Sequence, residues 1–316
     1  MGNRRKIVLL SVVALVLVIL YLTIGLNSRN WEYALSRRIP NTIAIIATGA
    51  AIAFATTVFQ TVTNNRVLTP GVMGLDSLYL VIQTAIVFAF GSTSLVVVNR
   101  QLNFLLAVGG MVVFALLLYN LLFKRESTDI YFVLLVGLIV GTLFQSGASF
   151  MQMVIDPNEF LVLQNRMFAS FNNVNTDILL IALVAMGVVL LYSRRYFAVL
   201  DVLALGRDQA INLGVEYEGI VRRMLIVVAV LMAVSTGLVG PITFLGLLVT
   251  NLAREFLSTY EHKYLVLGSV LVAVIALVGG QLLAERVFNF VTPISVLINL
   301  AGGLYFIYLL LKEHQL

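Results

Sequence analysis

The chain has 316 residues, of which 60% are hydrophobic and only 11% are charged, with a mean hydropathy of +1.02. Soluble domains carry about 25% charged residues, so this composition excludes a water-soluble globular protein and indicates a chain that lies in a lipid bilayer. The net charge of +5 does not call for a nucleic-acid partner, because cytoplasmic loops of membrane proteins are rich in Lys and Arg. The absence of cysteine excludes disulfides, thiol nucleophiles and thiolate metal ligands.

Long uncharged runs predict the membrane helices. A helix needs about 20 residues to cross the hydrocarbon core, and a charge at its centre costs about 2.5–3.5 kcal/mol. The runs do not alternate as barrel strands do, so we expect an all-α integral membrane protein with no soluble domain. The first run has a basic flank and no cleavage-site pattern, which favours a retained span over a signal peptide. The nine runs are 7–28, 39–65, 77–99, 101–123, 130–155, 178–193, 224–253, 264–284 and 287–311.

The run 224–253 is longer than one span requires. Its 30 residues contain Gly240-Pro241, and as a single helix it would extend about 45 Å against a core of about 30 Å. Proline removes a backbone donor and glycine loosens the backbone, so two short helices or one tilted, kinked helix would fit. Two helices give about ten spans with both termini cytoplasmic. This topology places more Lys and Arg on the cytoplasmic side than nine spans do, as the positive-inside rule favours.

Two polar connections separate the spans. The first, at 151–177, is predicted to hold short helices on the outer face. The second includes 201–219, DVLALGRDQAINLGVEYEG, which combines charged residues with three glycines on the cytoplasmic side. From its composition alone, this stretch is either a solvated loop or a surface that binds another protein.

Motifs for catalysis are missing. There is no G-x-x-x-x-G-K-[ST] sequence, so the chain does not bind ATP by a P-loop. The only histidines, His262 and His314, stand alone, so no metal site is predicted. Asp76 begins the third run, where an acid indicates a functional site or, equally, a helix start favoured by the macrodipole. We therefore expect no enzyme activity, no catalytic residue and no cofactor, and an energy source supplied by another protein.

Six motifs, in order, resemble the permease subunit of ABC importers for iron-siderophores, haem and vitamin B12. Together they extend over nearly the whole chain. The sequence departs from the family at Asn41, where an arginine is common, and at Thr250-Asn251, where many members have Pro-His. The motifs are Arg38-Ile39-Pro40, Thr69-Pro70-Gly71-Val72-Met73-Gly74, Ala204-Leu205-Gly206 with Leu213-Gly214-Val215, Gly240-Pro241-Ile242-Thr243-Phe244-Leu245-Gly246-Leu247, Leu252-Ala253-Arg254 and Pro293-Ile294-Ser295-Val296-Leu297.

The resemblance implies a single transmembrane permease domain over 1–316, with ten helices, in the cell (inner) membrane. It implies as partners a second permease subunit, identical or homologous, two cytoplasmic ATP-binding subunits and an external substrate-binding protein, with no nucleic acid. The substrate would be an iron(III)-siderophore, and the tract LTPGVMGLDSLYL at 68–80 resembles permeases for catecholate-type siderophores. A haem or cobalamin permease, a non-ABC carrier or channel, and a membrane scaffold remain alternatives.

The resemblance also implies two protein-binding sites. The outer arginines Arg37, Arg38 and Arg286 would receive carboxylates of the binding protein, because the guanidinium group holds a carboxylate with two hydrogen bonds. Snorkelling to lipid headgroups is the alternative. The segment 201–219 would seat the ATPase and move with it. Its predicted coupling residues are Leu205, Gly206, Arg207, Ala210, Leu213, Gly214 and Val215.

A translocation path is predicted at the inner half of the second run and in the segment that follows it. The predicted path residues are Gln60 and Asn64 within the run and Pro70 and Gly71 after it. Polar groups at this depth need partners or water, which favours a cavity lining, although packing between helices is an equal alternative. Gly137 and Gly141 form G-x-x-x-G, which predicts close packing of helices inside the subunit or between two subunits.

Overall fold

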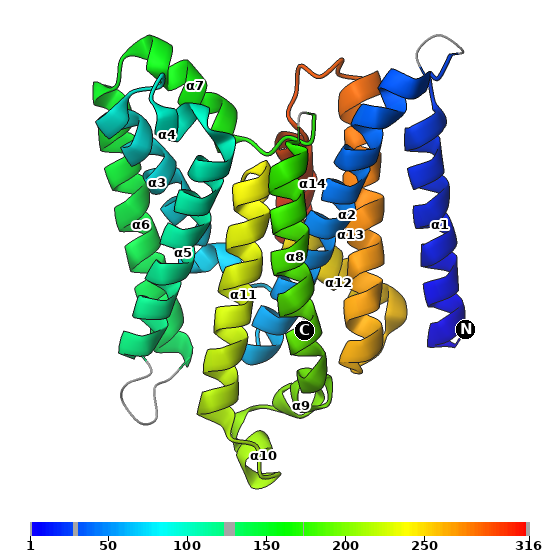
Figure 1. The fold of residues 1–316 in the computed structure, drawn as a ribbon. Coiled ribbons are helices and arrows are strands. Elements are labelled where there is room, and N and C mark those ends of the chain that lie inside the picture. Colours follow the sequence, from blue (N-terminus) through cyan, green and yellow to red (C-terminus); the bar gives the residue numbers. More distant parts are fainter. Residues whose placement is uncertain (1, 28–30, 123–129, 173, 314–316) are drawn as a thin grey trace.

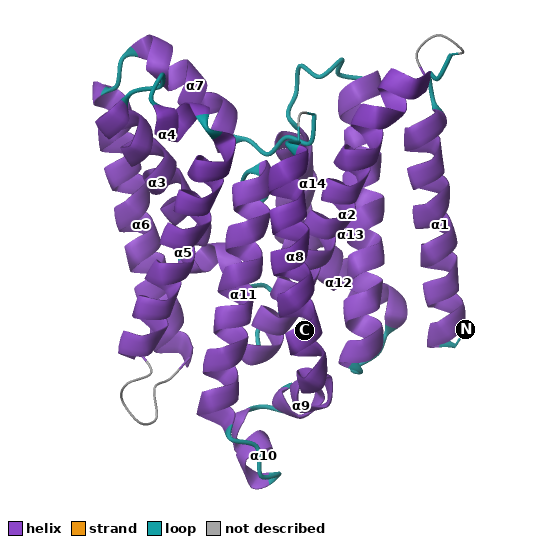
Figure 2. Cartoon of the chain, in the orientation of Figure 1, coloured by secondary structure: helices purple, strands orange, loops and turns teal. Residues whose placement is uncertain are grey.

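The computed structural model describes residues 2–27, 31–122, 130–172 and 174–313, and every regular element within these ranges is a helix (Figures 1 and 2). By length and composition, seven helices of this part can cross a membrane: α1 (Asn3–Thr23), α2 (Trp31–Val62), α5 (Arg100–Leu122), α6 (Ile130–Val154), α8 (Thr176–Ser193), α11 (Tyr217–Val239) and α13 (His262–Arg286). Three more lie among them: α3 (Leu75–Phe90), α12 (Leu245–Leu257) and α14 (Ile294–Glu313). These ten helices confirm the predicted all-α membrane architecture.

Short helices connect the long ones. They are η1 (Pro70–Met73, a 3-10 helix), α4 (Leu95–Val98), α7 (Pro157–Met167), η2 (Arg194–Tyr196, a 3-10 helix), α9 (Phe197–Leu203) and α10 (Arg207–Asn212). The predicted short helix within 151–177 is α7. It begins where the side chain of Asp156 accepts a hydrogen bond from the backbone N–H of Asn158 at 2.8 Å, and this contact satisfies one of the free donors at a helix start.

The run 224–253 forms two helices, as one of the two alternatives predicted. α11 ends at Val239, and Gly240 adopts φ +100°. A Cβ at Gly240 would lie 3.0 Å from the Cα of Ala169, so both the backbone conformation and the close approach require glycine. α12 has 13 residues, about 20 Å, so it is shorter than the hydrocarbon core.

The last run begins later as a helix than its composition suggests. The uncharged residues from 287 to 293 form a connection in which Asn289 and Phe290 have positive φ, and α14 starts only at Ile294, after Pro293. A run of apolar residues shows that a segment avoids water, but it does not show where the backbone leaves the helical conformation.

α2 and α11 lie at the centre of the bundle. α2 packs against α11, α12 and α13, and its buried side is rich in Ala and Thr. α1 lies at one edge against α13, with only Ala14 and Tyr21 buried, whereas α3, α5 and α6 form the opposite side (Figure 1). The large apolar side chains that α1, α6 and α8 leave exposed face the surroundings of the bundle, which is the arrangement expected in lipid.

The G-x-x-x-G pair packs inside the subunit. A Cβ on Gly141 would lie 2.8 Å from the Cα of Gly74, and one on Gly137 would lie 3.0 Å from the Cα of Met73. α6 therefore approaches the start of α3 at backbone-to-backbone distance, which supports the first of the two packing alternatives.

The bundle has two ends. At the inner end, Lys6 in the first turns of α1 donates a hydrogen bond to the carbonyl of Phe256 at the end of α12, at 2.6 Å, and α9 and α10 project there (Figure 1). At the outer end, Arg38 near the start of α2 contacts the last residues of α1 and α13. The predicted topology assigns the inner end to the cytoplasm.

Candidate functional site

The predicted coupling segment forms two short helices at the inner end. α9 closes at Leu203, the chain turns at Gly206, α10 runs to Asn212, and a second turn at Gly214 leads into α11. Gly206 has φ +100° and ψ 168°, a conformation that is open essentially to glycine alone, and Gly214 has φ +82°. Glycine at both positions therefore allows the chain to turn sharply on either side of α10.

The apolar face of this segment differs in part from the prediction. Leu205 is 58% exposed and Leu213 is 63% exposed, so both are open to a partner. Ala210 is fully buried against the protein's own core, which corrects its predicted place on the contact face, and Val215 is partly buried against the same core. Ile211, which the sequence reading missed, is 47% exposed. A six-residue helix is too short for periodicity to identify its outer side.

Ion pairs join the two ends of the segment. Arg207 contacts Glu218 at 3.2 Å, and Arg223 contacts Glu216 at 3.8 Å. All four side chains are exposed, and exposed pairs contribute only about 0–1 kcal/mol each. They orient α10 on the start of α11 rather than determine the stability of the bundle.

Asp201 links α9 to the membrane helices. Its Oδ1 accepts hydrogen bonds from the backbone N–H of His262, at 2.7 Å, and from its Nδ1, at 2.6 Å. The other ring nitrogen of the buried His262 lies 2.7 Å from the hydroxyl of Thr61 in α2. One polar chain therefore connects α9 with α13 and α2.

The inner cavity, about 370 Å³ in volume, adjoins this chain. Two predicted path residues line it, Gln60 and Asn64, together with Arg66, Arg254 and His262. Gln60 and Asn251 each donate a side-chain hydrogen bond to the carbonyl of Arg66, at 2.7 and 3.0 Å. Asn251 belongs to Thr250-Asn251, one of the two places at which the sequence departs from the family pattern, and the sequence did not predict this contact with Arg66.

The inner cavity is positively charged. Arg254 has a buried Nε with no hydrogen-bond partner in the described part of the chain, and the residues that line the cavity include two arginines and no acid. Guanidinium groups bind carboxylate and phosphate oxygens. The lining of this cavity therefore favours an anionic group over a cationic one.

The other predicted path residues lie elsewhere. Pro70 is the first residue of η1 and is buried, and Gly71 lines a second cavity of about 280 Å³, here called the middle cavity. Asp76, Thr243 and Asn299 also line it. The residues predicted for the path are thus divided between the inner cavity and the middle cavity, and Pro70 lines neither of these two.

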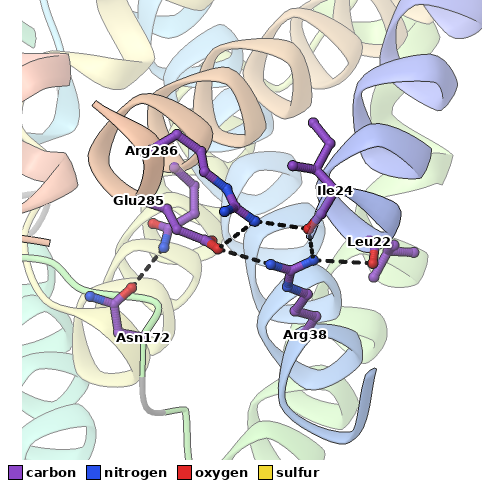
Figure 3. A network of polar contacts seen from close by, with 7 residues as sticks. Leu22, Ile24, Arg38, Asn172, Glu285 and Arg286 are labelled. Atoms are coloured by element: carbon purple, nitrogen blue, oxygen red, sulfur yellow. Dashed lines mark hydrogen bonds and ion pairs between the residues drawn. The ribbon is translucent and has the colours of Figure 1, made fainter. Parts of the chain in front are cut away.

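The three outer arginines differ in accessibility. Arg38 is only 14% exposed: it contacts Glu285 at 2.9 Å and donates to the carbonyls of Leu22 and Ile24 (Figure 3). Arg286 also donates to Ile24, at 2.8 Å, but remains partly exposed. Arg37 is exposed and donates to the hydroxyl of Tyr33. Arg37 and Arg286 are therefore reachable from outside, whereas Arg38 joins α1, α2 and α13 to one another.

The chain was compared with known proteins. Residues 7–312 match the FecCD transport family. The petrobactin import system permease protein YclO of Bacillus subtilis (strain 168) is 56% identical over 315 residues, which cover 100% of this chain and 99% of that protein. The petrobactin import system permease protein FatC of Bacillus anthracis is 34% identical, over 100% of this chain and 91% of that protein.

A solved structure shows the same fold. A metal-chelate type ABC transporter in an inward-facing conformation superposes with a TM-score of 0.83 at 21% identity, over 98% of this chain and 100% of that one. The ten helices, the short helices of the coupling segment and the family match over nearly the whole length agree with one another. The chain is a multi-pass membrane permease and belongs to the FecCD transport family.

Proposed function

We propose that the chain is the permease subunit of an ATP-driven importer for ferric petrobactin or a closely similar catecholate-type iron(III)-siderophore. The observation that carries this proposal is the 56% identity, from end to end, with a petrobactin import permease of Bacillus subtilis. A second petrobactin permease, from Bacillus anthracis, supports it at 34% identity.

The proposed importer draws its energy from separate subunits. The sequence has no P-loop, and the exposed Leu205, Ile211 and Leu213 offer an apolar contact of the kind that a partner protein buries. Two cytoplasmic ATPases would bind there, one on each of two permease subunits, and an external binding protein would deliver the substrate.

The proposed mechanism is alternating access. Closure of the ATPases displaces α9 and α10, and the contacts of Asp201 with His262 and of His262 with Thr61 pass the displacement to α13 and α2. The inner cavity then opens or closes. Its arginines would favour an anionic ferric chelate, since catecholate oxygens carry negative charge and bind guanidinium groups well.

Uptake of radioactive iron tests the substrate. Cells that lack this chain are expected to lose uptake of iron-55 supplied as ferric petrobactin, to regain it when the chain is restored, and to keep uptake of a ferric hydroxamate throughout. Loss of haem or cobalamin uptake, with ferric petrobactin uptake unchanged, would contradict the proposal.

The outer arginines provide a separate test of docking. Reversing the charge of Arg37 and Arg286 together is expected to slow uptake by about tenfold, since charge pairs at the rim of an interface chiefly govern encounter and orientation. The amount of permease in the membrane should not change. The matched variant with lysine at both positions should keep most of the rate, whereas equal uptake by the reversed and unaltered proteins would remove both residues as docking sites.

A further inference from the structure

Asp76 is a buried acid that the proposed mechanism does not use. It lies in the first turn of α3, just after Gly74, which precedes the helix. Both of its carboxylate oxygens are buried, and within the described part of the chain the one group placed to hydrogen-bond them is the side chain of Thr243. An ionised carboxylate with a single neutral partner inside a membrane protein is poorly compensated and costs several kcal/mol, so such a group binds a cation or carries a proton.

The carboxylate borders the middle cavity, which is rich in oxygen atoms. Side chains from four segments line it: Asp76 and Ser77 of α3, Gln145 of α6, Thr243 of the connection before α12, and Ser295 and Asn299 of α14. Each carries an oxygen that can face a cation. Its volume of about 280 Å³ exceeds the roughly 30 Å³ of one water molecule severalfold, so an ion with some of its water, or a small ammonium group, fits.

Two of these oxygens are held in place by the backbone. The Ser295 hydroxyl oxygen accepts a hydrogen bond from the N–H of Ala169 at 3.1 Å, and the Asn299 side-chain oxygen accepts one from the N–H of Phe244 at 3.3 Å. Each oxygen keeps a second lone pair. Gly71 leaves space on the other side, because a Cβ there would lie 3.0 Å from Oδ2 of Asp76.

The charge of the cavity determines the class of ligand. Asp76 is the one acid among the residues that line it, and no lysine or arginine is among them. The described residues contain no group of three or more His, Cys, Asp or Glu that could hold a metal ion. Divalent cations are bound by several carboxylates or by dedicated oxygen cages, whereas one carboxylate with neutral oxygens balances a single positive charge.

We propose that the middle cavity is a binding site for a monovalent cation, either an alkali ion or an ammonium group, with Asp76 as its counter-charge. Thr243, Ser295 and Asn299 complete the site. The bound cation joins the start of α3 to α14 and to the connection before α12. This site goes beyond the proposed transport of a siderophore and does not depend on which chelate is carried.

Direct binding of sodium-22 to the purified full-length chain in lipid nanodiscs tests the proposal. We expect saturable binding of about one ion per chain, and at least tenfold weaker binding in Asp76→Asn, a loss of about 1.4 kcal/mol. Asp177→Asn, which neutralises the exposed acid in the first turn of α8, is the matched control and should bind as the unaltered chain does. Competition by potassium or by ethylammonium distinguishes an alkali-ion site from an ammonium site.

A second variant keeps the carboxylate and crowds it. Gly71→Ala brings a methyl group against Asp76 and is expected to weaken sodium binding severalfold, so the proposal can be tested even if Asp76→Asn does not fold. Absence of saturable binding of either cation to the unaltered chain would overturn the proposal and leave Asp76 a protonated acid. Equal binding by folded Asp76→Asn and the unaltered chain would overturn it too.

Discussion

Replacing Gly141 with leucine is expected to abolish the folded permease. The Cα of Gly141 lies against Gly74, and even a Cβ at position 141 would come within 2.8 Å of the neighbouring Cα. Backbone atoms cannot move aside as the tip of a side chain can, so a leucine must push α6 away from the start of α3. Overpacking a core costs about 1–3 kcal/mol where side chains yield, and more is expected here.

The measurement is the amount of monodisperse protein extracted from the membrane, followed by size-exclusion chromatography of a fluorescent fusion. Gly147→Leu is the matched control on the same helix, because the atom nearest to a Cβ there is a methyl carbon of Val81 at 3.9 Å. The control should retain most of the monodisperse peak. Equal yields from Gly141→Leu and the unaltered chain would contradict the packing described for α6.

Aspartate at both Leu205 and Leu213 is expected to abolish uptake while leaving the permease in the membrane. Both leucines are mostly exposed at the inner end, so the change removes little internal packing. Burying a leucine in a partner contributes about 1.5–3 kcal/mol. Losing two such contacts and burying two charges instead therefore lowers the affinity for the ATPase by well over tenfold.

Iron uptake in cells and co-purification of the ATPase subunit are the two measurements. The variant with methionine at positions 205 and 213 retains the apolar contact, so its iron uptake and its co-purification with the ATPase should stay near normal. Asn212→Asp adds a charge to the exposed end of α10 without removing a leucine and should have a much smaller effect. If the double aspartate variant still co-purified with the ATPase and transported iron, the contact would lie elsewhere.

The local features of the fold could be predicted from the sequence because each depends on residues close together in the chain. Long uncharged runs correspond to the membrane helices, Gly240-Pro241 marks the break between α11 and α12, and Gly206 and Gly214 mark the turns of the coupling segment. The order of family motifs extended this reading to the architecture and to the class of function, which the family match confirms.

The contacts that organise the sites could not be predicted, because they join residues far apart in the chain. Arg38 pairs with Glu285, and Asp201 pairs with His262. No local sequence pattern distinguishes an arginine that is free to bind an external protein from an arginine that bonds to neighbouring helices of its own chain. Burial is equally hard to predict from neighbouring residues. Ala210 lies in a polar stretch of the sequence, yet the protein's own core covers it.

In the proposed mechanism, the coupling segment joins the ATPase to the membrane helices. The turns on either side of α10 leave Leu205 and Leu213 exposed, and Asp201 ties the same segment to α13 and, through His262, to α2. The proposed ATPase contact and the polar contacts to the membrane helices therefore belong to one short stretch.

Labelling of a single cysteine tests this claim most directly. The chain has no cysteine of its own, so Leu213→Cys introduces a unique thiol on the exposed side of the coupling segment. A membrane-impermeant maleimide should label it in inside-out vesicles from which the ATPase has been stripped, and rebinding of the ATPase should protect it. Labelling from the outside of intact cells, or equal labelling with and without the ATPase, would contradict the account.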